Sequence, residues 1–483
     1  MAAQAAHAAG PSCTAADLVS PPRGWNSYDS TVGNHGINET VALASARFVA
    51  AVLKPHGYTY LTLDSGWFGT DSLIGADNGQ HVDEWGRLLP NATFYPTGFG
   101  KLQALTKKLG LQWGFWIMGG IPRVAVDAMS KVKGTKYTAD QIADTSGDRS
   151  KGGAFGCPWN RWLVFGSKRL EDGSLHPGAV KYYDSIAELY ASWGVDIIKM
   201  DCVFGGDYYR GKAEMEQFAR SMKKASKKPV LLSLSPGQTG NASVMGPIGA
   251  AFAGKGGAAQ GMDVIARMTG DFWDHWLQLH DHFSGAAPAV APLQTSSFQG
   301  DLDMLPLGYL RHEDNPTNTS GHFSNFNEDE ARSLMAQWAM ARAPLIWGGA
   351  ASKDLANATT LALITNDRVL NVGNSSCGNG RVKTSHGGAV QYWAANTVSG
   401  GEKYIAIFNI GEETIEYDWD LLYDKTTKLP GPPWMRATDL SALELWDGDK
   451  PLPLAKSMPK GPGLGRLKGT LRPHASLLVL VSG

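Results

Sequence analysis

The sequence predicts a (β/α)8 TIM barrel followed by a C-terminal antiparallel β-sandwich. From residue 21 to about residue 366, short apolar runs alternate with amphipathic stretches, the pattern of strand–helix units around a parallel sheet. After about residue 373 the apolar runs continue without helices and are separated by Gly, Pro and Asn. The 483 residues also exceed what one hydrophobic core usually holds. We therefore expect an N-terminal extension (1–20), a barrel (21–372) and a sandwich (373–483).

Eight predicted strands build the barrel. Two weaker ones lie at 23–28 and 298–304, and the strong ones lie at 58–64, 111–118, 195–201, 229–235, 264–271 and 344–349. Helices are expected at 39–57, 98–110, 179–194, 211–225 and 328–343. The first helix places Ala42, Ala46, Val49 and Leu53 on one face, and Gly57 ends it. A doubly wound sheet is the alternative, but no G-x-G-x-x-G or Walker sequence follows a strand.

The sandwich is predicted from strands at 389–396, 403–411, 413–421, 442–448 and 475–482. These strands cluster no catalytic residue types. We therefore expect the sandwich to pack against the barrel and to leave the chemistry to the barrel.

Composition excludes several classes of protein. A hydrophobic content of 43% and 16 Trp indicate a folded chain, and the aromatic residues suit either a core or a sugar pocket. A net charge of −1 without a large basic cluster argues against nucleic acid and anionic membranes as partners. No apolar run reaches the roughly 18 residues of a membrane span. The four Cys form no C-x-x-C pair and no zinc spacing with His, so no metal is predicted. No cofactor is predicted either, because the sequence has no cofactor-binding motif.

Six N-x-[ST] sequons predict a secreted protein or one in a vacuolar or lysosomal lumen; they begin at Asn38, Asn91, Asn241, Asn318, Asn357 and Asn374. The first residues, MAAQAAHAAGPSC, contain no charged n-region and no Leu-rich h-region. We expect any signal peptide to have been removed already.

Charged residues end several strands that are otherwise apolar. In DIIKMDC, Lys199 and Asp201 share a face because side chains two apart in a strand point the same way. Arg267, Thr269 and Asp271 repeat this pattern in VIARMTGD. The C-terminal ends of barrel strands form one rim, where barrel enzymes carry their chemistry.

A third strand, YLTLD, brings Asp64 to the same rim. Each Asp could instead cap the helix that follows, although capping does not account for Lys199 and Arg267 on the same faces. Two opposed carboxyl groups in an aromatic pocket suit glycoside hydrolysis, in which one attacks the anomeric carbon or activates water and the other protonates the leaving oxygen. A cation beside Asp201 should lower the pKa of Asp201 and keep it ionised. Arg267 should act in the same way on Asp271, which opposes a role as an acid that must hold its proton.

These motifs resemble the α-galactosidase (melibiase) family, glycoside hydrolase family 27. The resemblance runs from PPRGWNSYDS through GYTYLTLDSGW, DEWGRLLPNATFYPTGF, LGLQWGFWIMGG, WGVDIIKMDC, RMTGDFWDHW, GDLDMLPLG and MARAPLIWGG to YIAIFNIGEE. It implies that Asp201 is the nucleophile and Asp271 the acid/base of a retaining exo-glycosidase. The two carboxyl groups would then lie about 5 to 5.5 Å apart.

The resemblance also implies a sugar pocket and a disulfide. Its expected substrate-binding residues are Tyr28, Asp64, Ser65, Trp67, Trp116, Lys199, Ser235 and Arg267. Among the aromatic residues, Tyr28 and Trp116 would face the sugar, while Trp25 and Trp67 pack behind them. Cys157 and Cys202 would form the disulfide, with a free buried thiol as the alternative.

Two departures from the family pattern bear on the substrate. Ser65 stands where typical members have a second Asp for the O4 and O6 of galactose, and LSLSPG (232–237) lacks their acidic and aromatic residues. Both resemble the branch linked with β-L-arabinopyranosidase activity, so we expect terminal α-D-galactosyl or β-L-arabinopyranosyl residues of an oligosaccharide, polysaccharide or glycoconjugate. A gluco-specific isomalto-dextranase-like enzyme and a catalytically silent carbohydrate-binding protein are the alternatives.

Overall fold

The structure is a computed structural model of the chain. It describes residues 20–31, 37–69, 81–146, 164–201, 208–235, 249, 252–291, 294, 297–311, 321–400, 402–421, 440–448, 450–456 and 464–483, with the side chains of 208–210 excepted.

Eight parallel strands form the barrel in the order β12-β1-β2-β3-β6-β7-β8-β9. Their bounds are β1 Arg23–Asn26, β2 Tyr60–Leu63, β3 Gln112–Met118, β6 Ile197–Asp201, β7 Leu231–Ser235, β8 Val264–Arg267, β9 Phe298–Asp301 and β12 Leu345–Trp347. Beyond β9, Leu305 forms a parallel bridge with Trp347 of β12, which closes the ring. The doubly wound alternative is therefore excluded, and all eight predicted strands are confirmed.

One strand prediction was too long. β8 ends at Arg267, so the expectation that Thr269 and Asp271 continue its inward face was wrong. The amide of Met268 still donates to the carbonyl of Asp301, but the chain then turns away from the sheet. Asp271 therefore lies on the loop after β8.

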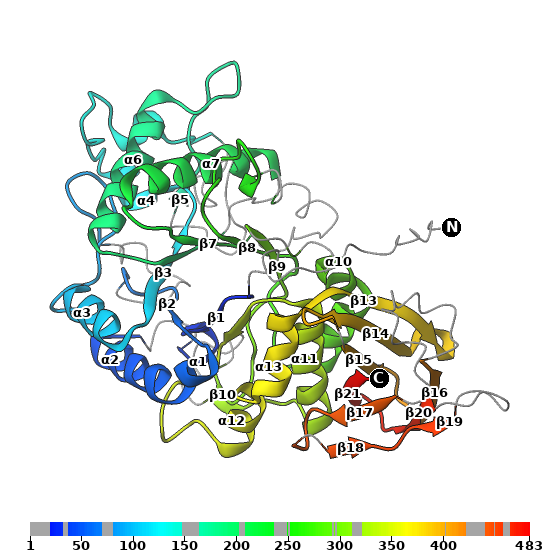
Figure 1. Ribbon diagram of the computed structural model, residues 1–483. Helices are drawn as coiled ribbons and strands as arrows, with labels where there is room; N and C mark the ends of the chain where they lie inside the picture. The colour runs from blue at the N-terminus through cyan, green and yellow to red at the C-terminus, as the bar shows by residue number, and fades with distance from the viewer. Residues whose placement is uncertain are drawn as a thin grey trace.

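Helices wrap the outside of the barrel (Figure 1). Their bounds are α1 Tyr28–Thr31, α2 Glu39–Phe48, α3 Gly100–Leu109, α4 Arg123–Asp127, α5 Ala139–Ile142, α6 Pro177–Ser192, α7 Tyr208–Ala225, α9 Trp276–Asp281, α10 Ala287–Val290, α11 Glu328–Ala341, α12 Ala358–Ile364 and α13 Asp367–Ser375. Each of the five predicted helices is present. The first continues past α2 as a π-helical turn, Val49–Leu53, and then a 3-10 turn, Lys54–His56. It ends at Gly57, whose φ of 85° only glycine adopts readily.

Short antiparallel strand pairs lie in the loops. β4 (Ile121–Pro122) pairs with β5 (Val164–Phe165), and β10 (Tyr309–Leu310) pairs with β11 (His322–Phe323). The β10–β11 pair lies next to α1, since the amide of Arg311 donates to the carbonyl of Asp29.

The C-terminal part is a sandwich of two antiparallel sheets, with strand orders β13-β14-β15-β21-β17-β18 and β16-β20-β19. The five predicted strands are β14 Val390–Thr397, β15 Glu402–Asn409, β16 Ile415–Asp420, β17 Ser441–Glu444 and β21 Ser476–Ser482. Sequence reasoning missed β13 Ser376–Ser385, β18 Lys450–Leu452, β19 Ala455–Lys456 and β20 Leu464–Leu471. Helix α13 runs across the expected boundary between residues 372 and 373.

The larger sheet of the sandwich has two buried faces. Along β14, Val390 and Tyr392 pack against the smaller sheet, while Trp393 and Ala395 join the core of the barrel. Helix α11 lies between the barrel and this sheet, and its residues from Ser333 to Ala341 are buried (Figure 1). No helix among the described residues is long and apolar enough to cross a membrane.

Candidate functional site

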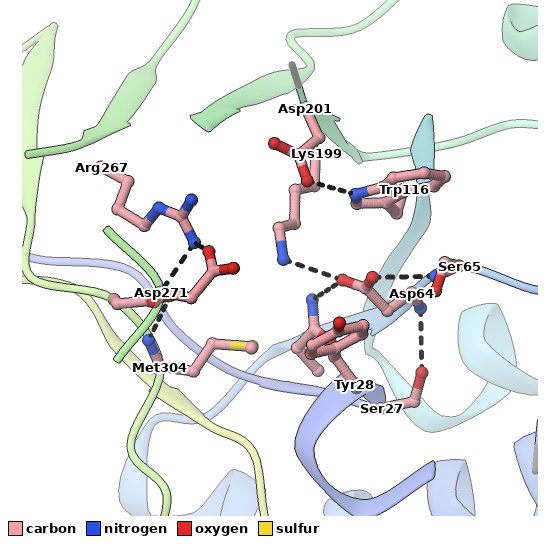
Figure 2. Close-up of polar contacts among 12 residues, drawn as sticks. Ser27, Tyr28, Asp64, Ser65, Trp116, Lys199, Asp201, Arg267, Asp271 and Met304 are labelled. Atoms are coloured by element: carbon pink, nitrogen blue, oxygen red, sulfur yellow. Dashed lines mark hydrogen bonds and ion pairs between the residues drawn. The ribbon is translucent and has the colours of Figure 1, made fainter. Parts of the chain in front are cut away.

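Charged side chains from several barrel strands meet at the C-terminal rim (Figure 2). β2 leads into Asp64, β6 carries Lys199 and Asp201, and β8 ends at Arg267. Because all strands are parallel, these ends meet on one side of the barrel. The structure places these four residues together at the rim, as the sequence predicts.

Asp64 and Lys199 form a fixed ion pair. Asp64 is 2% exposed, and its Oδ2 accepts hydrogen bonds from Asn26 Nδ2 at 2.8 Å and Lys199 Nζ at 2.9 Å. Its Oδ1 accepts the amide of Ser65, and its own amide donates to Ser27 Oγ (Figure 2). Burial alone would lower the pKa of Lys199, but Asp64 and the nearby acids outweigh it and raise that pKa. Lys199 is therefore a permanent cation in the site.

Asp201 is held by Trp116. The indole Nε1 of Trp116 donates to Asp201 Oδ2 at 3.1 Å, and the pairing of β3 with β6 places the two strands in register for this contact. Burial raises the pKa of Asp201, although Arg267, Lys199 and the Trp116 hydrogen bond oppose the rise. The expectation that cations hold the pKa of Asp201 down was thus wrong for the sugar-free site, because desolvation is the larger effect.

Arg267 is shared between two acids. Its Nη1 lies 2.5 Å from Asp271 Oδ1 and 3.3 Å from Asp303 Oδ2. Arg267 therefore lowers the pKa of Asp271, the effect predicted for a cation beside this acid. The side chain of Asp271 is 57% exposed, so it can move within the open part of the site.

Asp201 and Asp271 face the same space. The charge of Asp271 raises the pKa of Asp201, and the ammonium of Lys199 lowers the pKa of both. Figure 2 has the Lys199 ammonium and both carboxyl groups turned toward a common centre. The predicted separation of the two carboxyl groups stays a prediction.

Two acids at the end of β9 were missed. Asp301 and Asp303 follow the buried run FQG, so they carry the same signal that identified Lys199 and Asp201. Burial and the charge of Asp303 raise the pKa of Asp301 to about 7. Asp301, Asp303, Lys199 and Arg267 line a small cavity inside the barrel, together with Ser235.

The remaining predicted residues divide into pocket and support. The ring of Tyr28 lies 5.7 Å from Lys199 Nζ and 6.1 Å from the ring of Trp273, which places it in the wall of the site. Ser65 is half-buried beside Asp64. Ser235 is 2% exposed, and its hydroxyl has no hydrogen-bond partner among the described residues.

Trp67 packs behind the pocket wall, as the resemblance implies. Its side chain is fully buried, and its Nε1 donates to the carbonyl of Trp116 at 2.8 Å. Its ring packs against Phe68, Phe99 and Phe115. Trp67 therefore supports Trp116 from behind and does not line the pocket. Cys157 and Cys202, the predicted disulfide, lie outside the described residues.

Known proteins resemble this chain along most of its length. No family model matches the sequence. A probable α-galactosidase from Dictyostelium discoideum is 24% identical over 437 residues, which cover 89% of this chain and 85% of the relative. An α-galactosidase from Oryza sativa subsp. japonica is 24% identical over 402 residues, covering 80% of this chain and 71% of the relative.

Solved structures resemble it more closely. A GH27 β-L-arabinopyranosidase from Geobacillus stearothermophilus is 29% identical, with a TM-score of 0.78 and coverage of 96% of both chains. A putative α-N-acetylgalactosaminidase from Bacillus halodurans C-125 is 28% identical, with a TM-score of 0.74 and coverage of 96% of this chain and 97% of the other.

Proposed function

Because the chain is similar along 96% of its length to a GH27 β-L-arabinopyranosidase, we propose that it is a retaining, metal-independent exo-glycosidase of glycoside hydrolase family 27. Asp201 attacks the anomeric carbon and forms a covalent glycosyl-enzyme, while Asp271 protonates the leaving oxygen. In the second step Asp271 takes a proton from water, which then releases the sugar. The observation that carries this proposal is the pair of carboxyl groups that share the charge of Lys199, Asp201 at the end of β6 and Asp271 on the loop after β8.

The pKa of each acid in the free site is shifted against its role. Entry of a sugar can change both. A sugar hydroxyl that engages Arg267 weakens the Arg267–Asp271 pair, and exclusion of water from Asp271 favours its neutral form. Lys199 and Arg267 meanwhile keep two positive charges beside Asp201, which favour its ionised form.

The substrate we propose is a terminal α-D-galactosyl or β-L-arabinopyranosyl residue. Asp64 offers one carboxylate to sugar hydroxyls, and Ser65 offers a neutral hydroxyl where a second carboxylate would grip a C6 hydroxymethyl group. Arabinopyranose is galactopyranose without that group, so the loss of about 1.5 to 3 kcal/mol from a missing charged hydrogen bond falls mainly on galactose. The similarity to a β-L-arabinopyranosidase supports the same choice.

A secretory or luminal location is proposed on separate grounds. Cys377 is disulfide-bonded, which suits an oxidising compartment, and its partner lies outside the described residues. The sequon at Asn357 is exposed and open to glycosylation, whereas Asn91 is fully buried and cannot carry a glycan. The pairing of Cys157 with Cys202 is kept as a proposal.

A panel of nitrophenyl glycosides tests the function. We expect hydrolysis of the β-L-arabinopyranoside and the α-D-galactopyranoside. NMR of the released sugar should show retention of the anomeric configuration, and a chelator should have no effect on the rate. Asp201→Asn should lose on the order of 10³-fold or more in kcat because the nucleophile is gone.

Other outcomes select the alternatives. Cleavage of isomalto-oligosaccharides alone indicates the gluco-specific enzyme. Sugar binding by calorimetry without any turnover indicates a silent binding protein. Inversion of the anomer contradicts Asp201 as nucleophile.

A further inference from the structure

We propose that Asp303 is a positioning residue for Asp271, because its one carboxylate holds both the Arg267 side chain and the backbone next to Asp271. This inference rests on the proposed glycosidase function. Asp303 acts through Arg267 and the loop after β8, without a role as a second acid/base.

Asp303 is fixed on every side. Its side chain is 6% exposed, and its Oδ2 accepts the amide of Phe272, the residue after Asp271, at 2.9 Å. Its Oδ1 accepts the amide of Met304 at 2.9 Å, and its carbonyl accepts the indole Nε1 of Trp338 at 3.0 Å. These contacts make Asp303 a rigid anchor for the start of the loop that carries Asp271.

The backbone of Asp303 is strained. Its φ of 83° lies in the left-handed region, which a non-glycine residue adopts only at some cost. Its amide donates to Asp301 Oδ1, so the surrounding chain imposes this conformation. Strain that the fold maintains beside a reactive group is typical of functional sites.

Arg267 needs a partner that stays charged. Arg267 is 5% exposed, and a buried guanidinium without a counter-charge is costly. When Asp271 takes up a proton, its pairing with Arg267 is lost, and the carboxylate of Asp303 at 3.3 Å remains. Asp303 therefore lowers the cost of the protonated state of Asp271, the state that an acid catalyst requires.

The surrounding charges do not substitute for Asp303. Among the described residues, the titratable groups coupled to Arg267, Asp271 or Asp303 are Lys199 and Asp201 of β6, Asp301 of β9, Asp29 of α1 and His282, whose pKa burial lowers. Asp64 is engaged by Lys199, and burial raises the pKa values of Asp301 and Asp29 so that these two acids favour their protonated forms. Asp201 is reserved for attack on the sugar.

Asp303→Asn tests the inference. Asparagine has nearly the same shape and tolerates a positive φ, but it removes the charge. Arg267 then pairs with Asp271 alone, so the pKa of Asp271 falls. In the sugar-bound enzyme, whose pKa values the kcat profile reports, the basic limb should therefore move down by about one pH unit. That shift is about a tenfold loss of activity on the basic side. A dinitrophenyl glycoside, whose leaving group needs little protonation, should be affected less.

Asp274→Asn is the matched control. Asp274 is a buried acid on the same loop, but its Oδ2 accepts from His322 Nε2 and the amide of Asn325 and it does not contact Arg267. This variant should leave the basic limb in place. Asp303→Glu keeps the charge and should also keep the limb, with a loss of kcat that does not depend on pH.

The outcomes separate the inference from the proposed function. If the unaltered enzyme is active and Asp303→Asn loses activity equally at every pH and for both leaving groups, Asp303 is only structural. If Asp303→Asn does not fold, Asp303→Glu decides. Because this variant keeps the charge, a basic limb that moves down in Asp303→Glu overturns the inference. If the unaltered enzyme hydrolyses no glycoside, the proposed function itself fails.

Discussion

Individual residues in the site work against strong desolvation. Two cations, Lys199 and Arg267, stand among several carboxyl groups, and burial raises the pKa of Asp201, Asp301 and Asp29. A buried acid without its own cation keeps its proton, because the interior disfavours an unpaired charge. Hydrogen bonds that stabilise the ionised form are therefore most valuable at Asp201.

Trp116→Phe measures that effect. Removal of the indole N–H takes away a hydrogen bond that lowers the pKa of Asp201. The pKa should rise, so the acidic limb of the kcat profile, which reports the sugar-bound enzyme, should move to higher pH. A lost hydrogen bond to a charged group also predicts a loss of about tenfold or more in activity.

Trp67→Phe is the control for this change. It removes the hydrogen bond from Trp67 Nε1 to the carbonyl of Trp116 but touches no atom of Asp201. We expect lower stability with the acidic limb unmoved. An equal shift of the limb in both variants would mean that packing, and not the hydrogen bond to Asp201, sets its pKa.

The sequence located most of this site but not all of it. Lys199, Asp201 and Arg267 are visible because a charge at the end of an apolar run is unusual. Asp303 carries the same signal, yet its role depends on a contact with Arg267 across the sheet, and spacing along the chain does not report such contacts. The sequence does not decide whether Trp67 contacts the sugar or only supports Trp116, because a buried indole and a pocket indole look alike in sequence.

Elements were predicted best where both faces are buried. The six strongly predicted barrel strands are short, mainly apolar runs, which are typical of buried parallel sheets. The missed strand β13, with the residues SCGNGRVKTS, has mostly exposed or half-buried side chains and no apolar run. Such an edge strand is specified by its partner β14, whose register only the folded chain reveals.

The pairing of β3 with β6 is the element on which the site depends most. Gly114 lies opposite Ile197, and a Cβ at Gly114 would stand 1.7 Å from the carbonyl oxygen of Ile197. Gly114→Ala must push these strands apart, and with them Trp116 and Asp201. We expect a loss of more than about 4 kcal/mol in the free energy of unfolding, or no soluble protein.

Gly100→Ala provides the comparison. Gly100 opens α3, and a Cβ there has no neighbour within 4 Å, so we expect unchanged or slightly higher stability. Denaturant unfolding measures both variants. A wild-type stability for Gly114→Ala would contradict the close approach of β3 and β6.

At the scale of the whole molecule, barrel and sandwich share one core. Phe408 and Trp393 of the sandwich belong to the same buried cluster as the barrel strands, and the ring of Phe408 lies 4.8 Å from that of Phe283. Polar contacts cross the same boundary, such as the hydrogen bond from Gln391 Nε2 to the carbonyl of Phe283 at 3.1 Å. Neither part can expose this surface to water without loss of buried apolar area.

We therefore expect the chain to unfold in a single cooperative transition. His474 reinforces the coupling, since its ring stacks on Trp276 with centroids 3.7 Å apart and its Nδ1 lies 2.7 Å from Glu330 Oε1. Calorimetry of the full chain should give one peak, and Phe408→Ala should lower its midpoint without splitting it, because a large-to-small change in a shared core costs about 3 to 5 kcal/mol. Ile407→Ala is the matched control: Ile407 is a neighbour on the same strand that packs toward the smaller sheet. Two separate peaks in the unaltered protein, or a peak that splits only in Phe408→Ala, would mean that the barrel holds together without the sandwich.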